Sequence, residues 1–120
     1  MKLQIRIHEW IVKTFGSESA SNVSERSFRF LEESLELCQA SGMTKLEAYR
    51  LVDYTFDRAI GVASQEVGGV VLTLSALCSA QNIDMILEGE TELDRVMSKI
   101  EVIREKNLHK IHRINYEQML

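Results

Sequence analysis

Three glutamates lie close together in the segment RFLEESLELCQA, residues 29–40: Glu32, Glu33 and Glu36. On a helix that turns by about 100° per residue, apolar side chains flank these acids on both sides. An ordinary surface helix places its acids opposite its apolar stripe. Carboxylates that share one cleft repel one another unless a cation neutralises them. The pattern therefore favours a metal site, although a solvated, glutamate-rich helix face is the common alternative.

A fourth acid, Glu66, is expected on a neighbouring helix, from which it could close this site. Magnesium takes oxygen ligands octahedrally and is commonly shared between carboxylates and the phosphates of a substrate. A metal held in this way can bridge phosphate oxygens and offset the charge that develops at phosphorus. The acids thus predict a site for Mg²⁺, with Mn²⁺ as a possible substitute, and Glu33 could either bind metal or position a water as general base. The predicted metal ligands are Glu32, Glu33, Glu36 and Glu66.

The elements that must position these residues are all expected to be helices, so the predicted fold class is all-α. The chain contains no proline, which favours long uninterrupted helices, and apolar residues recur at helical spacing. Asn22 with Glu25 and Thr44 with Glu47 have the spacing of helix capping pairs. The predicted helices cover about 3–15, 22–40, 44–58, 63–83 and 92–108 or beyond.

The helix expected at 63–83 carries a broad apolar face and, on another side, a seam of small residues: Gly69, Thr73, Ala76 and Ala80. Gly68 and Gly69 each cost about 1 kcal/mol relative to alanine inside a helix. This cost indicates tight packing or the close approach of a ligand. The segments 16–24, which is polar and rich in turn formers, and 84–92 are predicted to be connections.

Length and composition indicate one soluble domain, residues 1–120. Hydrophobic residues make up 45% of the chain, and the net charge of −4 argues against a dedicated nucleic-acid binder. The start of the chain does not resemble a signal peptide, and the longest uncharged run is too short to span a membrane. Cys38 and Cys78 are expected to be buried structural thiols. These features predict a cytoplasmic protein that is not associated with a membrane.

Three blocks of the sequence resemble the MazG-like, all-α nucleoside triphosphate pyrophosphohydrolases. They are FLEESLELCQA, QEVGGVVLTLSAL and ELDRVMSKIEVIREKN, and the resemblance covers about residues 26–107. It implies a four- to five-helix bundle that assembles as a dimer or tetramer. It also implies an enzyme in which water attacks the α-phosphorus of a nucleoside triphosphate or deoxynucleoside triphosphate, yielding the monophosphate and pyrophosphate. The first two blocks would supply magnesium ligands Glu32, Glu33, Glu36 and Glu66.

The third block suggests contacts to the phosphates or the nucleotide from Lys99, Arg104, Lys106 and Asn107. Asn107 lies in an apolar stripe, where an amide needs hydrogen-bond partners, so it could equally be a satisfied core residue. Arg29 lies near the glutamates and could bind phosphate, or it could pair with Glu25 or Glu33.

One position departs from the family pattern, because Gly69 stands where the second block of these enzymes has an aspartate. Asp53, Asp57 or Asp84 could replace that ligand if the fold brings one of them close. The alternative is a catalytically lapsed member of the family that serves as a nucleotide-binding or protein-interaction module. A third possibility is a structural helical oligomer whose glutamates are solvated.

Overall fold

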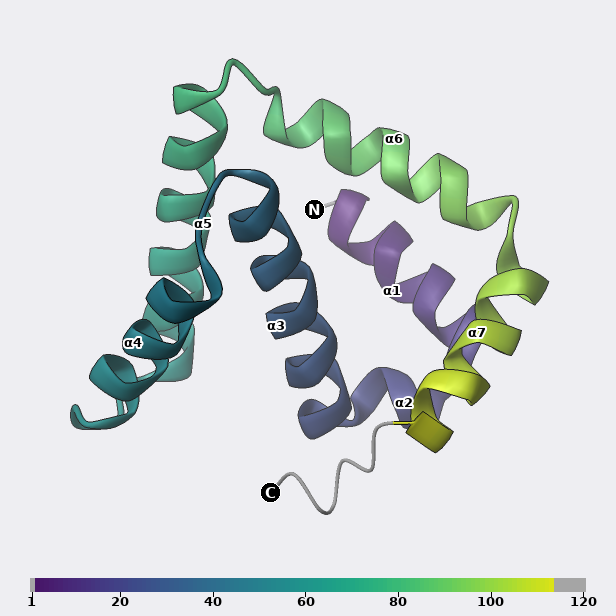
Figure 1. Ribbon diagram of the computed structural model, residues 1–120. Helices are drawn as coiled ribbons and strands as arrows, with labels where there is room; N and C mark the ends of the chain where they lie inside the picture. Colours follow the sequence, from purple (N-terminus) through teal and green to yellow (C-terminus); the bar gives the residue numbers. More distant parts are fainter. Residues whose placement is uncertain (1, 114–120) are drawn as a thin grey trace. The chain divides into compact units, whose positions relative to one another are not determined.

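The computed structural model describes the backbone of residues 2–113 and the side chains of residues 2–108, and every regular element in this part is a helix (Figure 1). The all-α prediction is therefore confirmed. Two compact units are distinguished: residues up to 28 together with those from 86 onward, and residues 29–85. The helices are α1 (Lys2–Phe15), α2 (Ser17–Ser21), α3 (Val23–Ala40), α4 (Lys45–Phe56), α5 (Ala63–Ala80), α6 (Met85–Met97) and α7 (Ile100–Arg113).

Two segments that were predicted to be connections contain helix. The polar segment 16–24 includes α2, in which the Ser21 hydroxyl donates to the carbonyls of Ser17 and Glu18. The segment 84–92 forms most of α6. The single last helix that was expected is divided into α6 and α7 by a turn at Ser98 and Lys99. The Ser98 hydroxyl donates to the Arg95 carbonyl, a bond that competes with the helical backbone pattern.

In the first unit, α1 packs against α2 and α7. Thr14 is buried on α1, and Leu93 and Val96 are buried on α6. Nη1 of Arg6 donates to both oxygens of the Glu90 carboxylate, at 2.7 and 3.0 Å, and this ion pair joins α1 to α6. Together these contacts make α1 the helix around which the unit is organised.

In the second unit, two helix-ending turns share a sequence pattern and a set of hydrogen bonds. LCQASGM (37–43) ends α3, and LCSAQNI (77–83) ends α5. The backbone N–H groups of Met43 and Ile83 donate to the carbonyls of Cys38 and Cys78, each at 2.9 Å. This bond and a left-handed residue before it define a Schellman ending.

The left-handed positions of the two turns are Gly42, with φ of 101°, and Asn82, with φ of 57°. Glycine and asparagine are residue types that tolerate this conformation. The side chain of Gln81 donates to the hydroxyl of Ser41 at 3.1 Å, and these two residues occupy equivalent positions 40 residues apart. Contact between equivalent positions is what an approximate local twofold axis produces. The second unit thus contains a helix–turn pattern used twice, which we did not predict from the sequence.

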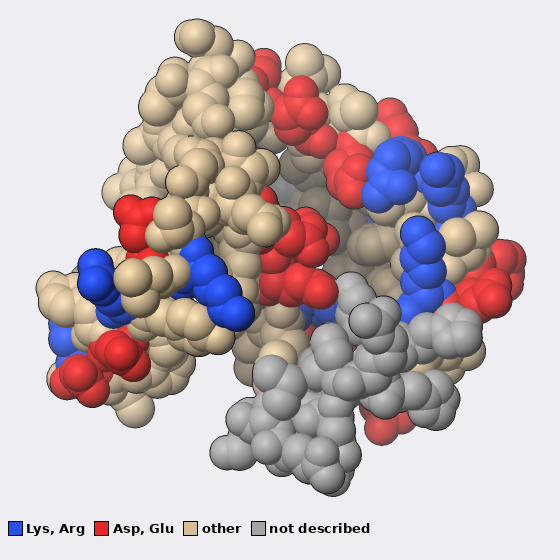
Figure 2. All heavy atoms as spheres, in the orientation of Figure 1, with Lys and Arg blue, Asp and Glu red and all other residues tan. Residues whose placement is uncertain are grey.

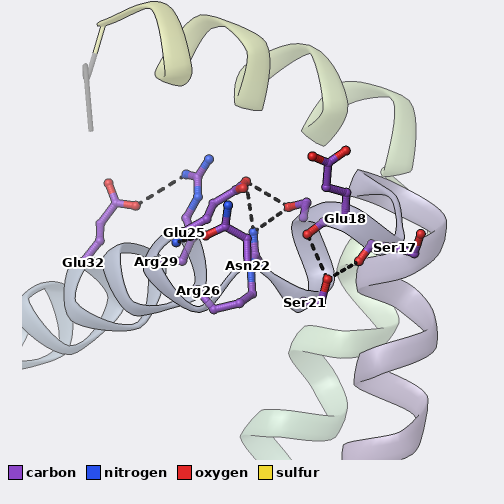
Figure 3. A network of polar contacts seen from close by, with 9 residues as sticks. Ser17, Glu18, Ser21, Asn22, Glu25, Arg26, Arg29 and Glu32 are labelled. Carbon is purple, nitrogen blue, oxygen red and sulfur yellow. Dashed lines mark hydrogen bonds and ion pairs between the residues drawn. The ribbon is translucent and has the colours of Figure 1, made fainter. Parts of the chain in front are cut away.

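Both predicted capping pairs are formed, one of them completely. The Thr44 hydroxyl accepts from the Glu47 N–H at 3.2 Å, and the Glu47 carboxylate accepts from the Thr44 N–H at 2.9 Å. At the start of α3 the Asn22 side chain accepts from the Glu25 N–H at 2.9 Å (Figure 3). The Glu25 carboxylate bonds to Ser19 and Arg26 instead of returning to the Asn22 backbone. Local sequence signals therefore position the starts of α3 and α4 correctly.

Candidate metal and nucleotide site

The four predicted metal ligands all belong to the second unit. Glu32, Glu33 and Glu36 lie on α3, and Glu66 lies in the first turn of α5. Glu32 is half-buried and the other three are exposed. Figure 2 shows acidic atoms gathered along α3 near the middle of the view. All four carboxylates can thus be reached by solutes from the solvent.

The apolar residues that flank these acids on α3 are not covered as expected. α3, whose residues are all described, has no buried side chain. Phe30, Leu31 and Leu35 are 54%, 52% and 44% exposed. Apolar residues therefore flank the acids on both sides of the helix, as predicted. In the described chain, however, these apolar side chains are not buried in a core.

Arg29 lies beside the first of these acids. Its guanidinium Nη1 lies 3.8 Å from Glu32 Oε1, one helical turn away (Figure 3). The ion pair expected here was with Glu25 or Glu33, and the structure shows one with Glu32. A contact of this length on a partly exposed surface contributes little stability and exchanges easily. Arg29 therefore brings positive charge to the acidic helix face and could move from Glu32 to an anionic ligand.

Glu66 is folded back toward the connection between α4 and α5. A Cβ atom at Gly61 would lie 2.6 Å from Glu66 Oε1, closer than real atoms approach. The absence of a side chain at position 61 therefore leaves room for this carboxylate. The Glu66 N–H donates to the Val62 carbonyl at 3.0 Å as α5 begins. The local backbone thus determines where Glu66 points.

The four acids have the right chemistry for magnesium, since carboxylate oxygens are its preferred ligands. Among the described residues, however, no three acid, histidine or cysteine side chains are grouped so that they could hold a metal ion. The same finding covers Asp53, Asp57 and Asp84, which were proposed to replace the aspartate that the family pattern has at the position of Gly69. As placed in the described chain, the predicted ligands therefore do not form one coordination set.

The residues predicted to bind the nucleotide lie in the first unit. Lys99 is exposed in the turn between α6 and α7, Lys106 is exposed on α7, and Asn107 is half-buried on α7. Their exposure leaves both lysines available to a phosphate.

Arg104, the remaining candidate of that group, is used to hold α1. Its Nε donates to the Thr14 carbonyl at 2.9 Å, its Nη2 donates to the Lys13 carbonyl, and its Nη1 pairs with Glu101 at 2.9 Å. The last carbonyls of a helix lack partners within the helix and carry partial negative charge. Arg104 therefore closes the C-terminal end of α1, a role that sequence reasoning missed because the two partners are 90 residues apart.

Comparisons with known proteins add no counterpart to this site, because no family model, no curated protein and no solved structure matches the chain. Within the described residues, no single helix is long and apolar enough to cross a membrane, and α5 and α6 meet that criterion only as a bent pair.

Proposed function

We propose that this chain is a magnesium-dependent nucleoside triphosphate pyrophosphohydrolase, which converts a nucleoside or deoxynucleoside triphosphate to the monophosphate and pyrophosphate. The observation that carries the proposal is a set of four solvent-accessible glutamates within one unit, three on adjacent turns of α3 and one in the first turn of α5. The resemblance of three sequence blocks to MazG-like enzymes supports the same reaction.

Glu32, Glu36 and Glu66 do not form one coordination set as placed in the described chain. In this proposal they would be drawn together on magnesium, whose charge offsets that of the triphosphate. Glu33 is exposed, so its carboxylate can hold metal or accept a proton from the attacking water. Arg29 exchanges its long contact with Glu32 for a phosphate oxygen of the substrate, since guanidinium groups bind phosphate in a bidentate manner. Lys99 and Lys106 stay the candidates for contacts to the phosphates that the sequence resemblance implies.

A second candidate is a nucleotide-binding or protein-interaction module that no longer turns over its ligand. Gly69 favours it, because this position lacks the carboxylate of the family pattern. A side-chain atom added at Gly69 would meet no atom within 4 Å apart from its own helix backbone. An aspartate could therefore be accommodated there in the described chain.

The decisive experiment offers the purified protein a panel of nucleoside and deoxynucleoside triphosphates with Mg²⁺ and measures release of pyrophosphate. We expect wild-type turnover that Glu36→Gln and Glu66→Gln abolish. Glu105→Gln, which changes an exposed glutamate on α7, is the matched control and should retain activity. Wild-type protein that releases no pyrophosphate with either Mg²⁺ or Mn²⁺ would overturn the enzymatic proposal.

Two further measurements separate the candidates. Metal binding to the folded state should raise the melting temperature of the wild type in Mg²⁺, and Glu32→Gln or Glu36→Gln should remove that rise. Gly69→Asp should give little gain in turnover if other residues of the chain supply the metal ligands. An inactive wild type that Gly69→Asp restores would identify the lapsed form.

A further inference from the structure

The side chain of Glu66 lies against the connection that precedes its own helix. A Cβ atom at Gly61 would lie 2.6 Å from Oε1 of Glu66, 3.3 Å from its Cδ and 3.5 Å from its Cγ. The outer half of the glutamate side chain therefore covers Gly61. Any other residue at position 61 would place its own side chain in the space that this carboxylate occupies.

The start of α5 is the feature that attracts a carboxylate to this place. The N-cap residue, Val62, has extended backbone angles and makes no side-chain hydrogen bond to the helix. The first backbone N–H groups of a helix lack partners within the helix and give its start a partial positive charge. Glu66 is the acid in the first turn of α5. Its carboxylate, folded back toward Gly61, therefore compensates a helix start that Val62 cannot cap.

This position of Glu66 explains why the four glutamates are not grouped as metal ligands in the described chain. Three of them project from α3, whereas the Glu66 carboxylate is drawn to the start of α5. Glu66 is exposed, and exposed side chains change rotamer within nanoseconds. Its carboxylate can thus leave Gly61 without disturbing a core.

We infer that Gly61 and the uncapped start of α5 hold the Glu66 carboxylate in a resting position, which it leaves in order to join a divalent metal ion at the acids of α3. Gly61 is then a positioning residue, because it affects metal affinity through Glu66 and does not contact the metal. The inference rests on the proposed function, since that function requires the metal.

The replacement Gly61→Ala removes the resting position selectively. The positive-φ glycines of the described chain are Gly16 and Gly42, so alanine meets no such backbone strain at position 61. The three atoms nearest to its Cβ all belong to the Glu66 side chain, whose flexible end can move. The folded protein therefore accommodates alanine by releasing Glu66.

The test measures Mn²⁺ binding by isothermal titration calorimetry. We expect Gly61→Ala to lower the Kd by roughly two- to fivefold, which is the attraction of a carboxylate to a helix start expressed as a ratio of affinities. Gly68→Ala is the matched control. It makes the same replacement about 200° around α5 from Glu66, where a Cβ meets no atom within 4 Å outside its own helix backbone, and it should leave the Kd unchanged.

Val62→Ser tests the contribution of the helix start. Val62 is 63% exposed, so the replacement costs little packing, and a serine N-cap accepts a hydrogen bond from the first N–H groups of the helix. The start of α5 then attracts the Glu66 carboxylate less strongly. We expect the Kd for Mn²⁺ to fall in this variant also.

The resting position is tested without metal by amide ¹H–¹⁵N spectra. Glu66→Ala removes the carboxylate and should shift the resonances of Gly61, Val62 and Ala63. Mg²⁺ added to the wild type should shift the same resonances in the same direction, because the carboxylate then leaves this place. Glu105→Gln, on another helix, should leave them unchanged.

The possible results separate this inference from the proposed function. A wild type that binds Mn²⁺ with a Kd that Gly61→Ala or Val62→Ser leaves unchanged or raises would overturn the inference and leave the proposed function standing. Resonances at Gly61 that do not respond to Glu66→Ala would do the same. A wild type that binds neither Mn²⁺ nor Mg²⁺ would overturn both.

Discussion

Arg104 shows how one side chain can serve a structural purpose that its residue type does not reveal. The residue stands in a block that resembles a nucleotide-binding helix, yet its guanidinium donates to the last carbonyls of α1 and pairs with Glu101. Lys106, two residues further along the same helix, is exposed. The neighbouring basic residues therefore differ in their surroundings, since Arg104 holds the end of α1 and Lys106 is exposed to solvent.

Replacing Arg104 by Gln should reduce stability and leave substrate affinity nearly unchanged. The variant loses charged hydrogen bonds to α1, so we expect the free energy of unfolding to fall by about 1–2 kcal/mol, measured by urea denaturation. Lys106→Gln is the control, and it should raise KM for the nucleotide while its unfolding curve matches the wild type. A large rise in KM for Arg104→Gln with unchanged stability would show that the residue binds substrate.

At the scale of elements, the start of α4 is a self-contained unit of stability. Thr44 and Glu47 satisfy each other's backbone N–H groups. The pKa of Glu47 lies below its usual value because its carboxylate accepts a hydrogen bond from the Thr44 backbone and a second from the Thr44 hydroxyl. The folded state favours the ionised carboxylate. Glu47 therefore stabilises the helix at pH values at which its carboxylate is ionised.

Thr44→Ala should lower the free energy of unfolding by about 1 kcal/mol at neutral pH, as measured by thermal or urea unfolding. The replacement removes the side-chain acceptor for the Glu47 N–H. Ser79→Ala, which changes an exposed serine inside α5, is the comparison. An equal loss in both variants would mean that the cap makes no specific contribution.

The contribution of Glu47 should also depend on pH in a defined direction. Because its pKa is lowered in the folded state, the stabilisation is complete above the unfolded value near 4.5 and is lost as the pH falls through the folded value. The difference in stability between wild type and Glu47→Gln should therefore shrink in acid. A difference that grows in acid would contradict the lowered pKa.

The helix α5 offers a second test at this scale, through its adjacent glycines. In the described chain a Cβ atom at Gly69 meets no atom within 4 Å beyond its own helix backbone. Gly69→Ala should therefore stabilise the protein by about 0.5–1 kcal/mol through helix propensity, measured by urea unfolding. A loss of stability would instead show that another helix approaches the small-residue seam in the assembled protein.

At the scale of the whole molecule, the described chain buries few apolar side chains. Among the described residues, Cys78, Leu93 and Val96 are the buried apolar ones. Folding must offset the loss of conformational entropy by removing apolar surface from water. We therefore expect a chain of 120 residues with so little burial to gain further stabilisation by assembly with other copies.

Stability should consequently depend on protein concentration. Dissociation accompanies unfolding of a dimer, so the melting temperature should rise by a few degrees, roughly 3 °C, for each tenfold increase in concentration. Calorimetry or circular dichroism over two decades of concentration would measure this rise. A wild type whose melting temperature does not change with concentration would argue for a self-sufficient monomer.

The sequence by itself determined the features that depend on neighbouring residues. The helical class, the cap at Thr44, the cap at Asn22 and the stop at Gly42 follow from side-chain-to-backbone bonds and backbone preferences within a few positions. The end of α5 at Asn82 has the same local origin as the end of α3 at Gly42. The pattern LCxAx precedes both residues, and it could have revealed the repeated helix–turn pattern.

The tertiary structure decided the features that join distant parts of the chain. α2 is a short polar helix whose sequence has no apolar periodicity, so no local pattern predicts it. In the structure it packs against α1. The partners of Arg104 lie 90 and 91 residues away, so no local pattern could identify them. The four glutamates were found by residue type and spacing, but the distances between α3 and α5 depend on packing. Whether a face that is apolar in sequence becomes buried, as at Cys78, or stays exposed, as at Val67, is decided by contacts remote in the chain, because burial requires a second surface that local sequence does not encode.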